Sequence, residues 1–165
     1  NFFVGYQQGA LYANPDGKVL DPVYAGDYES PDKGKELATT LYSKGADVVF
    51  AVAGKTGLGV FEAAKEQNGY AIGVDSDQKY IDPEHIICSV IKDIGGSIYQ
   101  VVANYLDNGT FDGGTIWDAD MTTGLISVGF GEDTMTQQVS DELKAEAQQL
   151  SQEIISGEIV VESTR

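Results

Sequence analysis

Three short apolar runs without polar alternation constrain the fold more than any other feature of this sequence. They cover residues 47–53 (DVVFAVA), 70–75 (YAIGVD) and 86–91 (IICSVI). Strands that are covered on both faces have this composition, because neither face meets water. Helical patterns lie between and around the runs, at residues 2–13, from Ser30-Pro31-Asp32 to Gly45, from the turn at Gly54 to about residue 67, and at 94–108. This alternation predicts an α/β fold in which the three runs are parallel neighbours in one sheet with helices on both faces.

The remaining segments give weaker patterns. Residues 18–24 (KVLDPVY) predict a strand, although Pro22 weakens it because proline cannot donate a backbone hydrogen bond. Residues 113–131 are rich in glycine and β-type residues and predict further strands. Leu143, Ala147, Leu150 and Ile154 recur at helical spacing and indicate a final amphipathic helix.

The charge balance argues against polyanionic partners. The 165 residues include 26 acidic and 10 basic side chains, a net charge of −16. Such a chain is repelled by nucleic acid phosphates and by anionic membrane surfaces, so no nucleic acid partner is expected. The single cysteine, Cys88, lies in an apolar run and is expected to be a buried, inert thiol.

The stretch AVAGKTGLGVFEAAK, residues 51–65, is similar to a phosphate-binding loop but does not complete the pattern. A phosphate loop reads G-x-x-x-x-G-K-[ST], and Val49 stands where its first glycine is required. The Gly57-Leu58-Gly59 set also fails as a dinucleotide fingerprint, because its sixth position is Glu62. We therefore expect no phosphate binding here. Gly54 and Gly57 either let the backbone approach a ligand closely or form a tight strand-to-helix turn.

Residues at the carboxyl ends of the predicted strands are the candidates for ligand binding. Ligands of parallel sheets bind beyond these ends. Asp75 ends the second run and can accept hydrogen bonds from vicinal hydroxyls, or it is a turn residue. Lys92 ends the third run and can pair with Asp75 and donate to a ligand oxygen, or it is a solvated lysine. Phe50 and Val52 are the best-placed apolar contacts, and Gly54 offers its backbone.

Chemistry beyond binding is not indicated. Asp75 and Asp77 do not begin a calcium loop, because Tyr80 and Ile86 stand at its glycine and glutamate positions. His85 is predicted to be a surface histidine with no nucleophile or metal set around it. We expect no enzyme, no metal and no cofactor.

Read together, several segments resemble a known family. They are FFVGYQQGA, GADVVFAVAGKTGLGVFEAAK, GVDSDQ and SVIKD. The sequence resembles the basic membrane protein family of ABC-transporter substrate-binding lipoproteins, whose best understood members bind purine nucleosides. The resemblance implies a type I periplasmic-binding fold with two lobes, ribose binding by Asp75 and Lys92, backbone contact at Gly54, and base stacking at Phe50 or Val52. It further implies permease and ATPase partners and an extracytoplasmic, lipid-anchored location.

The resemblance also implies a division of the chain. Residues 1–92 correspond to the second lobe and residues 93–165 to a return segment that includes the helix 94–108. The first lobe, which carries the rest of the site, is absent from these 165 residues, so binding by them alone is expected to be weak or nil. The apolar face of the helix 94–108 then needs that lobe or another chain as a partner. The rival hypotheses are a sugar or signal-molecule binder of the same fold, the effector domain of a regulator, and a flavodoxin-like enzyme domain.

Overall fold

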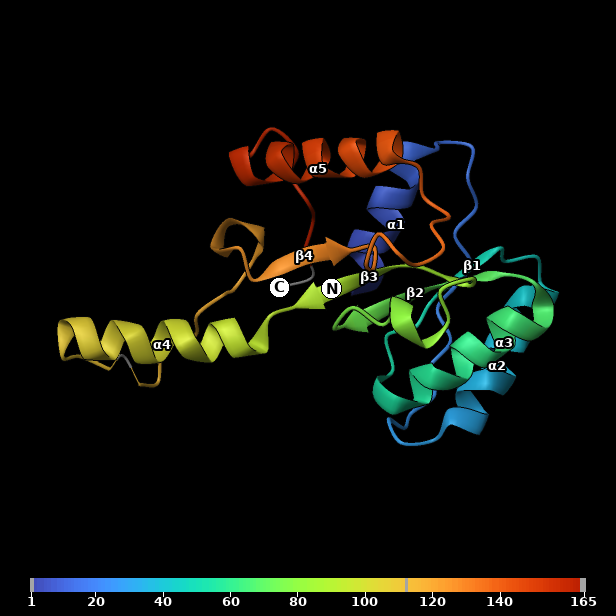
Figure 1. The fold of residues 1–165 in the computed structure, drawn as a ribbon, viewed down its shortest axis with the longest axis horizontal. Helices are drawn as coiled ribbons and strands as arrows, with labels where there is room; N and C mark the ends of the chain where they lie inside the picture. The colour runs from blue at the N-terminus through green and yellow to red at the C-terminus, as the bar shows by residue number, and fades with distance from the viewer. Residues whose placement is uncertain (1, 112, 164–165) are drawn as a thin grey trace.

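The computed structural model describes residues 2–111 and 113–163, and its centre is a mixed sheet of four strands (Figure 1). In the order in which they pair, the strands are β1 (Val48–Phe50), β2 (Tyr70–Asp75), β3 (Ile86–Lys92) and β4 (Ile126–Gly129). β1, β2 and β3 are parallel, whereas β4 runs antiparallel to β3. The predicted α/β fold with three parallel neighbours is confirmed.

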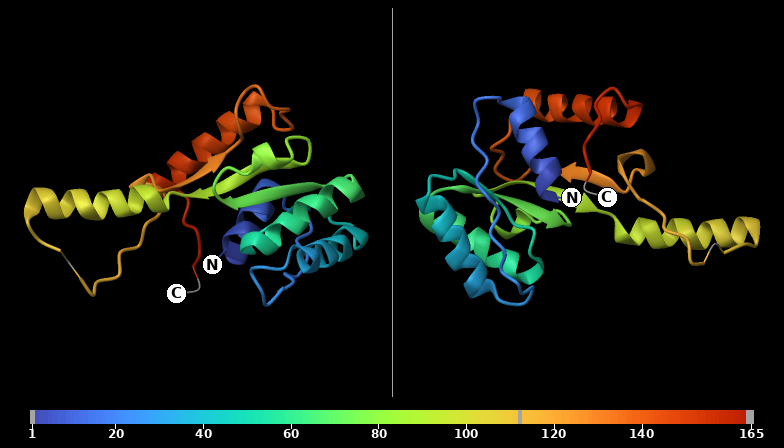
Figure 2. Two further views of the ribbon diagram at one scale, coloured as in Figure 1. Left: turned by 60° about the horizontal axis from the view of Figure 1, so that its bottom comes forward. Right: turned by 180° about the vertical axis from the view of Figure 1, so that it is seen from behind.

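Helices cover both faces of this sheet (Figures 1 and 2). α2 (Pro31–Ser43) and α3 (Leu58–Gln67) pack on one face, where Val49 belongs to their buried cluster. Successive strand residues point to opposite faces, and the next residue, Phe50, contacts Phe2 and Tyr6 of α1 (Phe2–Ala13). α5 (Asp141–Ser156) follows β4 and lies on the side of the sheet away from α2 and α3 (Figure 1).

Two glycines set the close packing of α2 on the segment that follows β1. A Cβ atom at Gly34 would lie 1.9 Å from the carbonyl oxygen of Thr56, and one at Gly59 would lie 1.9 Å from that of Pro31. No side chain fits at either position without moving backbone. The buried apolar cluster beneath is built largely from alanine and valine, which suits elements that approach this closely. Its members are Ala38, Tyr42, Val49, Ala51, Val60, Phe61, Ala63, Ala64, Ala71 and Ile86.

Three expectations about strands were wrong or too long. Residues 18–24 form no strand, in keeping with the missing N–H of Pro22. Residues 113–131 contain only β4 and the short 3₁₀ turn η3 (Met121–Thr123) among their described residues. β1 is three residues rather than seven, because the backbone turns after Phe50: Val52 N donates to Phe50 O and Ala53 N donates to Ala51 O.

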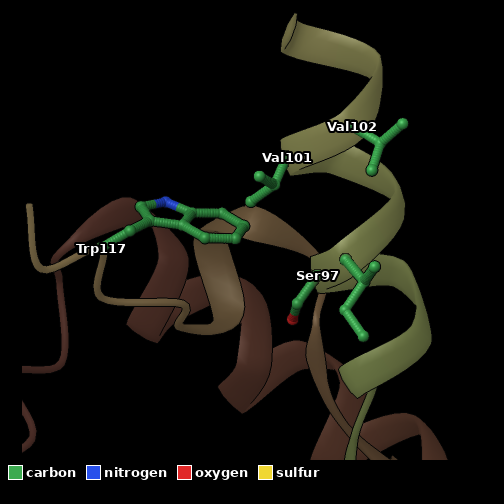
Figure 3. A pocket seen from close by; sticks show the side chains of 5 residues that line it. Ser97, Val101, Val102 and Trp117 are labelled. Atoms are coloured by element: carbon green, nitrogen blue, oxygen red, sulfur yellow. The ribbon is translucent and has the colours of Figure 1, made fainter. Parts of the chain in front are cut away.

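α4 (Ile94–Asn108) extends away from the rest of the fold (Figures 1 and 2). Its apolar side chains are open to solvent, with Ile98 61% and Tyr105 51% exposed. Two shallow hollows of about 410 and 230 Å³ lie along it, and Trp117 borders the smaller one, as Figure 3 shows. The expected apolar face is therefore present. None of the helices among the described residues combines the length and the hydropathy that crossing a membrane requires.

The glycine packing yields a prediction with opposite signs at two helical glycines. Gly34→Ala should lower the free energy of unfolding by at least ~2 kcal/mol, because the new methyl group meets a backbone carbonyl. Gly9→Ala should raise it by about 0.5–1 kcal/mol, because nothing lies within 4 Å of its Cβ position and alanine favours the helix. Urea unfolding of both variants measures the difference. Equal effects would contradict the packing argument.

Candidate functional site

Asp75 and Lys92 form an ion pair at the carboxyl edge of the sheet. The Lys92 ammonium lies 2.7 Å from a carboxylate oxygen of Asp75, and the two side chains are 36% and 52% exposed, respectively. They meet because β2 and β3 are parallel, with Asp75 opposite Ile91 in the register, so the last residues of both strands reach the same edge. The pair that the sequence placed at the two strand ends is thus brought together, and its polar atoms remain accessible to a ligand.

Asp75 is held in an unusual backbone conformation. Its φ angle is +71°, one of two positive values at non-glycine residues among those that the structure describes. Ser76 N donates a 2.9 Å hydrogen bond to Val74 O across it. This is the i to i+2 hydrogen bond of a γ-turn with positive φ, a strained conformation. Aspartate tolerates positive φ better than most residues, which fits its place here.

An aromatic ring, that of Phe2, lies beside the ion pair. The Phe2 ring lies 5.5 Å from the Lys92 ammonium, and its centroid is 6.1 Å from that of Phe50 in an edge-to-face arrangement. The Tyr6 ring also packs against Phe50, with 5.6 Å between the ring centroids. Phe2 is 39% exposed. The sequence singled out Phe50 but not Phe2, because only the packing of α1 on β1 shows that the first helix reaches this edge.

The loop after β1 supplies the other predicted residues. Val52 is 39% exposed directly after the strand. Gly54 has a φ of +56° and begins η1 (Gly54–Gly57), and a Cβ there would be 3.4 Å from Tyr28. The positive φ explains why glycine stands at this position. Val52 and Gly54 both follow β1 at the same carboxyl edge as Asp75 and Lys92.

The Lys55-Thr56 pair is engaged in holding a neighbouring loop. Thr56 is fully buried, and its hydroxyl accepts from Ser30 N at 3.0 Å and donates to Asp27 O at 3.0 Å. Thr56 N donates to Tyr28 O. The Lys55 ammonium forms an exposed ion pair of 2.7 Å with Glu29. These groups therefore fasten residues 27–30 to the turn after β1, and the resemblance to a phosphate loop has a structural explanation.

Lys79 is a buried polar residue that the sequence analysis did not single out. It is fully buried, and its ammonium donates to Ile86 O and Gln138 Oε1, both at 2.6 Å, and to Pro83 O at 3.3 Å. Burial lowers the pKa of this ammonium. Its partners lie in the loop before β3, at the first residue of β3 and in the segment before α5, so it joins these segments. Nothing in its sequence context distinguishes it from a surface lysine.

His85 and Cys88 are two further titratable residues whose exposure or burial was predicted from the sequence. His85 is partly buried rather than fully exposed: its side chain is 19% exposed and its Nδ1 lies 3.0 Å from a carboxylate oxygen of Asp82. Cys88 is partly buried, and burial raises the pKa of its thiol to about 11, which keeps it protonated and unreactive at neutral pH. Within the described residues, no group of three or more His, Cys, Asp or Glu side chains is placed to hold a metal ion.

The geometry is that of a candidate binding site at the carboxyl ends of parallel strands. An accessible ion pair, an adjacent aromatic ring and a glycine turn can hold a polar small molecule, and they include no activated nucleophile. These features are typical of an α/β ligand-binding protein.

The comparisons with known proteins name the family. A family model described as ABC transporter substrate-binding protein PnrA-like matches residues 1–165. The chain is 38% identical over 162 residues to basic membrane protein A of Borreliella afzelii, covering 97% of this chain and 48% of that protein. It is 40% identical over 162 residues to basic membrane protein A1 of Borrelia garinii subsp. bavariensis, covering 97% and 47%, respectively. The chain belongs to this family of substrate-binding proteins, which are extracytoplasmic and are not enzymes.

A solved structure supports the fold. The solute-binding protein of an ABC transporter system from Aeropyrum pernix K1 superposes with a TM-score of 0.75 at 24% identity, covering 99% of this chain and 53% of that one. The chain spans about half the length of the relatives and of the structure that it matches.

The role of Thr56 can be tested by removing one oxygen atom. Thr56→Val leaves Ser30 N and Asp27 O, which lie in a partly buried place, without their partner, and this should cost about 1 kcal/mol of unfolding free energy. Lys55→Ala should leave stability unchanged within error, because both partners of its ion pair are exposed. Urea unfolding distinguishes the two. A neutral Thr56→Val variant would show that the loop does not depend on this hydroxyl.

Proposed function

We propose that the chain is part of the substrate-binding component of an ABC importer and binds nucleosides, purine nucleosides in particular. The observation that carries the proposal is the accessible Asp75–Lys92 pair beside the Phe2 ring at the carboxyl edge of the sheet. A nucleoside has a ribose with vicinal hydroxyls and a planar base, and this edge offers a partner for each.

The ion pair suits a ribose because its two members do different work. The Asp75 carboxylate accepts hydrogen bonds from hydroxyl groups, and the Lys92 ammonium donates to a hydroxyl oxygen. Both side chains keep enough exposed surface to meet a ligand. Each group also orients the other across 2.7 Å, so the site is formed before the ligand arrives and less ordering accompanies binding.

The apolar part of the edge suits a base. Phe2 is partly exposed, and Phe50 packs against it in an edge-to-face contact. Val52 adds a partly exposed aliphatic contact, and the Gly54 turn lets backbone come near a ligand. Aromatic rings stack on the faces of nucleic acid bases, so Phe2 and Phe50 together provide a stacking wall.

The length of the chain bears on how this site works. Because the chain spans about half of the relatives it matches, we assign it to the second lobe of a two-lobed protein. The first lobe would close the cleft over Asp75 and Lys92 and cover part of the apolar face of α4. Permease and ATPase subunits would receive the ligand, and a lipid anchor would hold the protein at the outer face of the membrane.

A sugar or signal-molecule binder of the same fold is the second candidate. Asp75 and Lys92 would serve a free pentose as well as a nucleoside. The aromatic wall favours the nucleoside, because a pentose has no base to stack on it. Titration of the full-length protein with adenosine, guanosine and ribose separates the two. Binding of ribose as tightly as the nucleosides would favour the sugar binder.

The assignment of Asp75 gives the most direct test. Asp75→Ala should weaken binding of adenosine or guanosine by about 1–3 kcal/mol, or roughly 5- to 150-fold, because ribose hydroxyls lose their acceptor. Asp75→Asn keeps the shape and removes the charge, and it should weaken binding with little change in the melting temperature of the ligand-free protein. Calorimetric titration of the full-length protein measures both.

The control is Asp16→Asn, which changes an exposed aspartate in the turn after α1 and should bind as the wild type does. Affinities within about twofold of wild type for both Asp75 variants would mean that Asp75 is only a turn residue.

A further inference from the structure

The strained turn at Asp75 requires support from its surroundings. A positive φ at a non-glycine residue costs free energy, and it persists where neighbouring contacts over-determine the backbone. Such strain tends to occur at functional sites. The carboxylate that meets Lys92 therefore depends on whatever fixes the residues on either side of the turn, and Val74 is the nearest of them.

The side chain of Gln78 fixes Val74. Its Oε1 accepts a 2.8 Å hydrogen bond from the backbone N–H of Val74, and Val74 is 5% exposed, so water does not replace this acceptor. The backbone N–H of Gln78 in turn donates a 3.0 Å hydrogen bond to the hydroxyl of Ser89, a fully buried residue of β3. Gln78 thus connects the end of β2 to the middle of β3.

Gln78 accepts the hydrogen bond of Val74 N beyond the last residue pair of the β1–β2 ladder. The β1–β2 ladder ends at the pair of Phe50 and Ile72, with Ala51 N donating to Ile72 O. Strand residues alternate in the direction of their backbone groups, so Val74 N points to the same side as Ile72 O, beyond the end of β1. The amide oxygen of Gln78 takes the place of the acceptor that a longer β1 would supply.

Gly73 leaves room for this arrangement. A Cβ atom there would lie 2.6 Å from the Ser89 hydroxyl and 2.9 Å from Gln78 Oε1. Any other residue would push these two polar groups away from the strand. Gly73, Gln78 and Ser89 together form a support directly behind the turn at Asp75.

We propose that Gln78 is a positioning residue: by accepting from Val74 N and anchoring to Ser89, it holds Asp75 in its positive-φ turn with the carboxylate aimed at Lys92 and the ligand. This inference rests on the proposed role of Asp75 in ribose binding. It assigns Gln78 no contact with the ligand itself.

The test compares three variants of the full-length protein. Gln78→Met keeps the length of the side chain and removes the acceptor, whereas Gln78→Glu keeps an acceptor oxygen at the same place. Gln67→Met, at the exposed end of α3, is the matched control. Adenosine affinity is measured by calorimetry. NMR gives the exchange rate of the Val74 amide and the HN–Hα coupling constant of Asp75, which reports its φ.

Gln78→Met should accelerate exchange of the Val74 amide and weaken adenosine binding, each by about tenfold. Gln78→Glu and Gln67→Met should stay within about threefold of wild type in both measurements. Rescue by glutamate separates positioning from general loss of stability, since both Gln78 substitutions change the same side chain. Wild-type affinity in Gln78→Met, or an unchanged Val74 exchange rate, would overturn the proposal.

The outcome stays informative if the wild-type protein binds no nucleoside. That result would remove the proposed function, and the coupling constant then decides about Gln78. A changed Asp75 coupling in Gln78→Met that glutamate restores would support the positioning role. An identical coupling in all variants would overturn it.

Discussion

The parallel pairing of β1, β2 and β3 is the constraint on which the candidate site depends. Parallel strands place their carboxyl ends at one edge, so Asp75, Lys92 and the Gly54 turn meet although they are separated in sequence. The pairing also fixes which face each residue takes. Val49 enters the core beneath α2 and α3, while Phe50 turns to α1 and brings Phe2 beside Lys92. The register of the parallel strands therefore fixes both which residues enter the core and which residues meet at the site.

The turn after β1 shows how a motif can serve architecture instead of ligand chemistry. Its threonine is fully buried and holds residues 27–30, and its carbonyl lies where only a glycine at position 34 permits α2 to approach. The lysine is drawn to Glu29 at the surface. A phosphate would have to displace these contacts. What remains exposed is the rim of the turn, including the Lys55 side chain.

Much of this arrangement could be read from the sequence, since it follows from local patterns. The three apolar runs predicted the parallel strands, and strand ends predicted Asp75 and Lys92 as a pair, because both inferences need only short-range periodicity and the geometry of a parallel sheet. The strand predicted at residues 18–24 is absent, in keeping with the missing backbone N–H of Pro22. The prediction of His85 as a surface histidine was only partly right, because its contact with Asp82 depends on the fold of the loop.

By itself the sequence determined the three parallel strands with the helices around them, the family and the residues at the strand ends. The tertiary structure alone decided which distant groups meet there. Phe2 reaches Lys92 only through the packing of α1, and Lys79 is buried only because Gln138 and the loop before β3 close over it. The strained turn at Asp75 likewise depends on Gln78, which is hydrogen-bonded both to Val74 of β2 and to Ser89 of β3. The physical reason is that the spacing of apolar residues indicates only which face of its own helix or strand each residue occupies. Burial, strain and charge pairing arise between elements, once the chain has closed on itself.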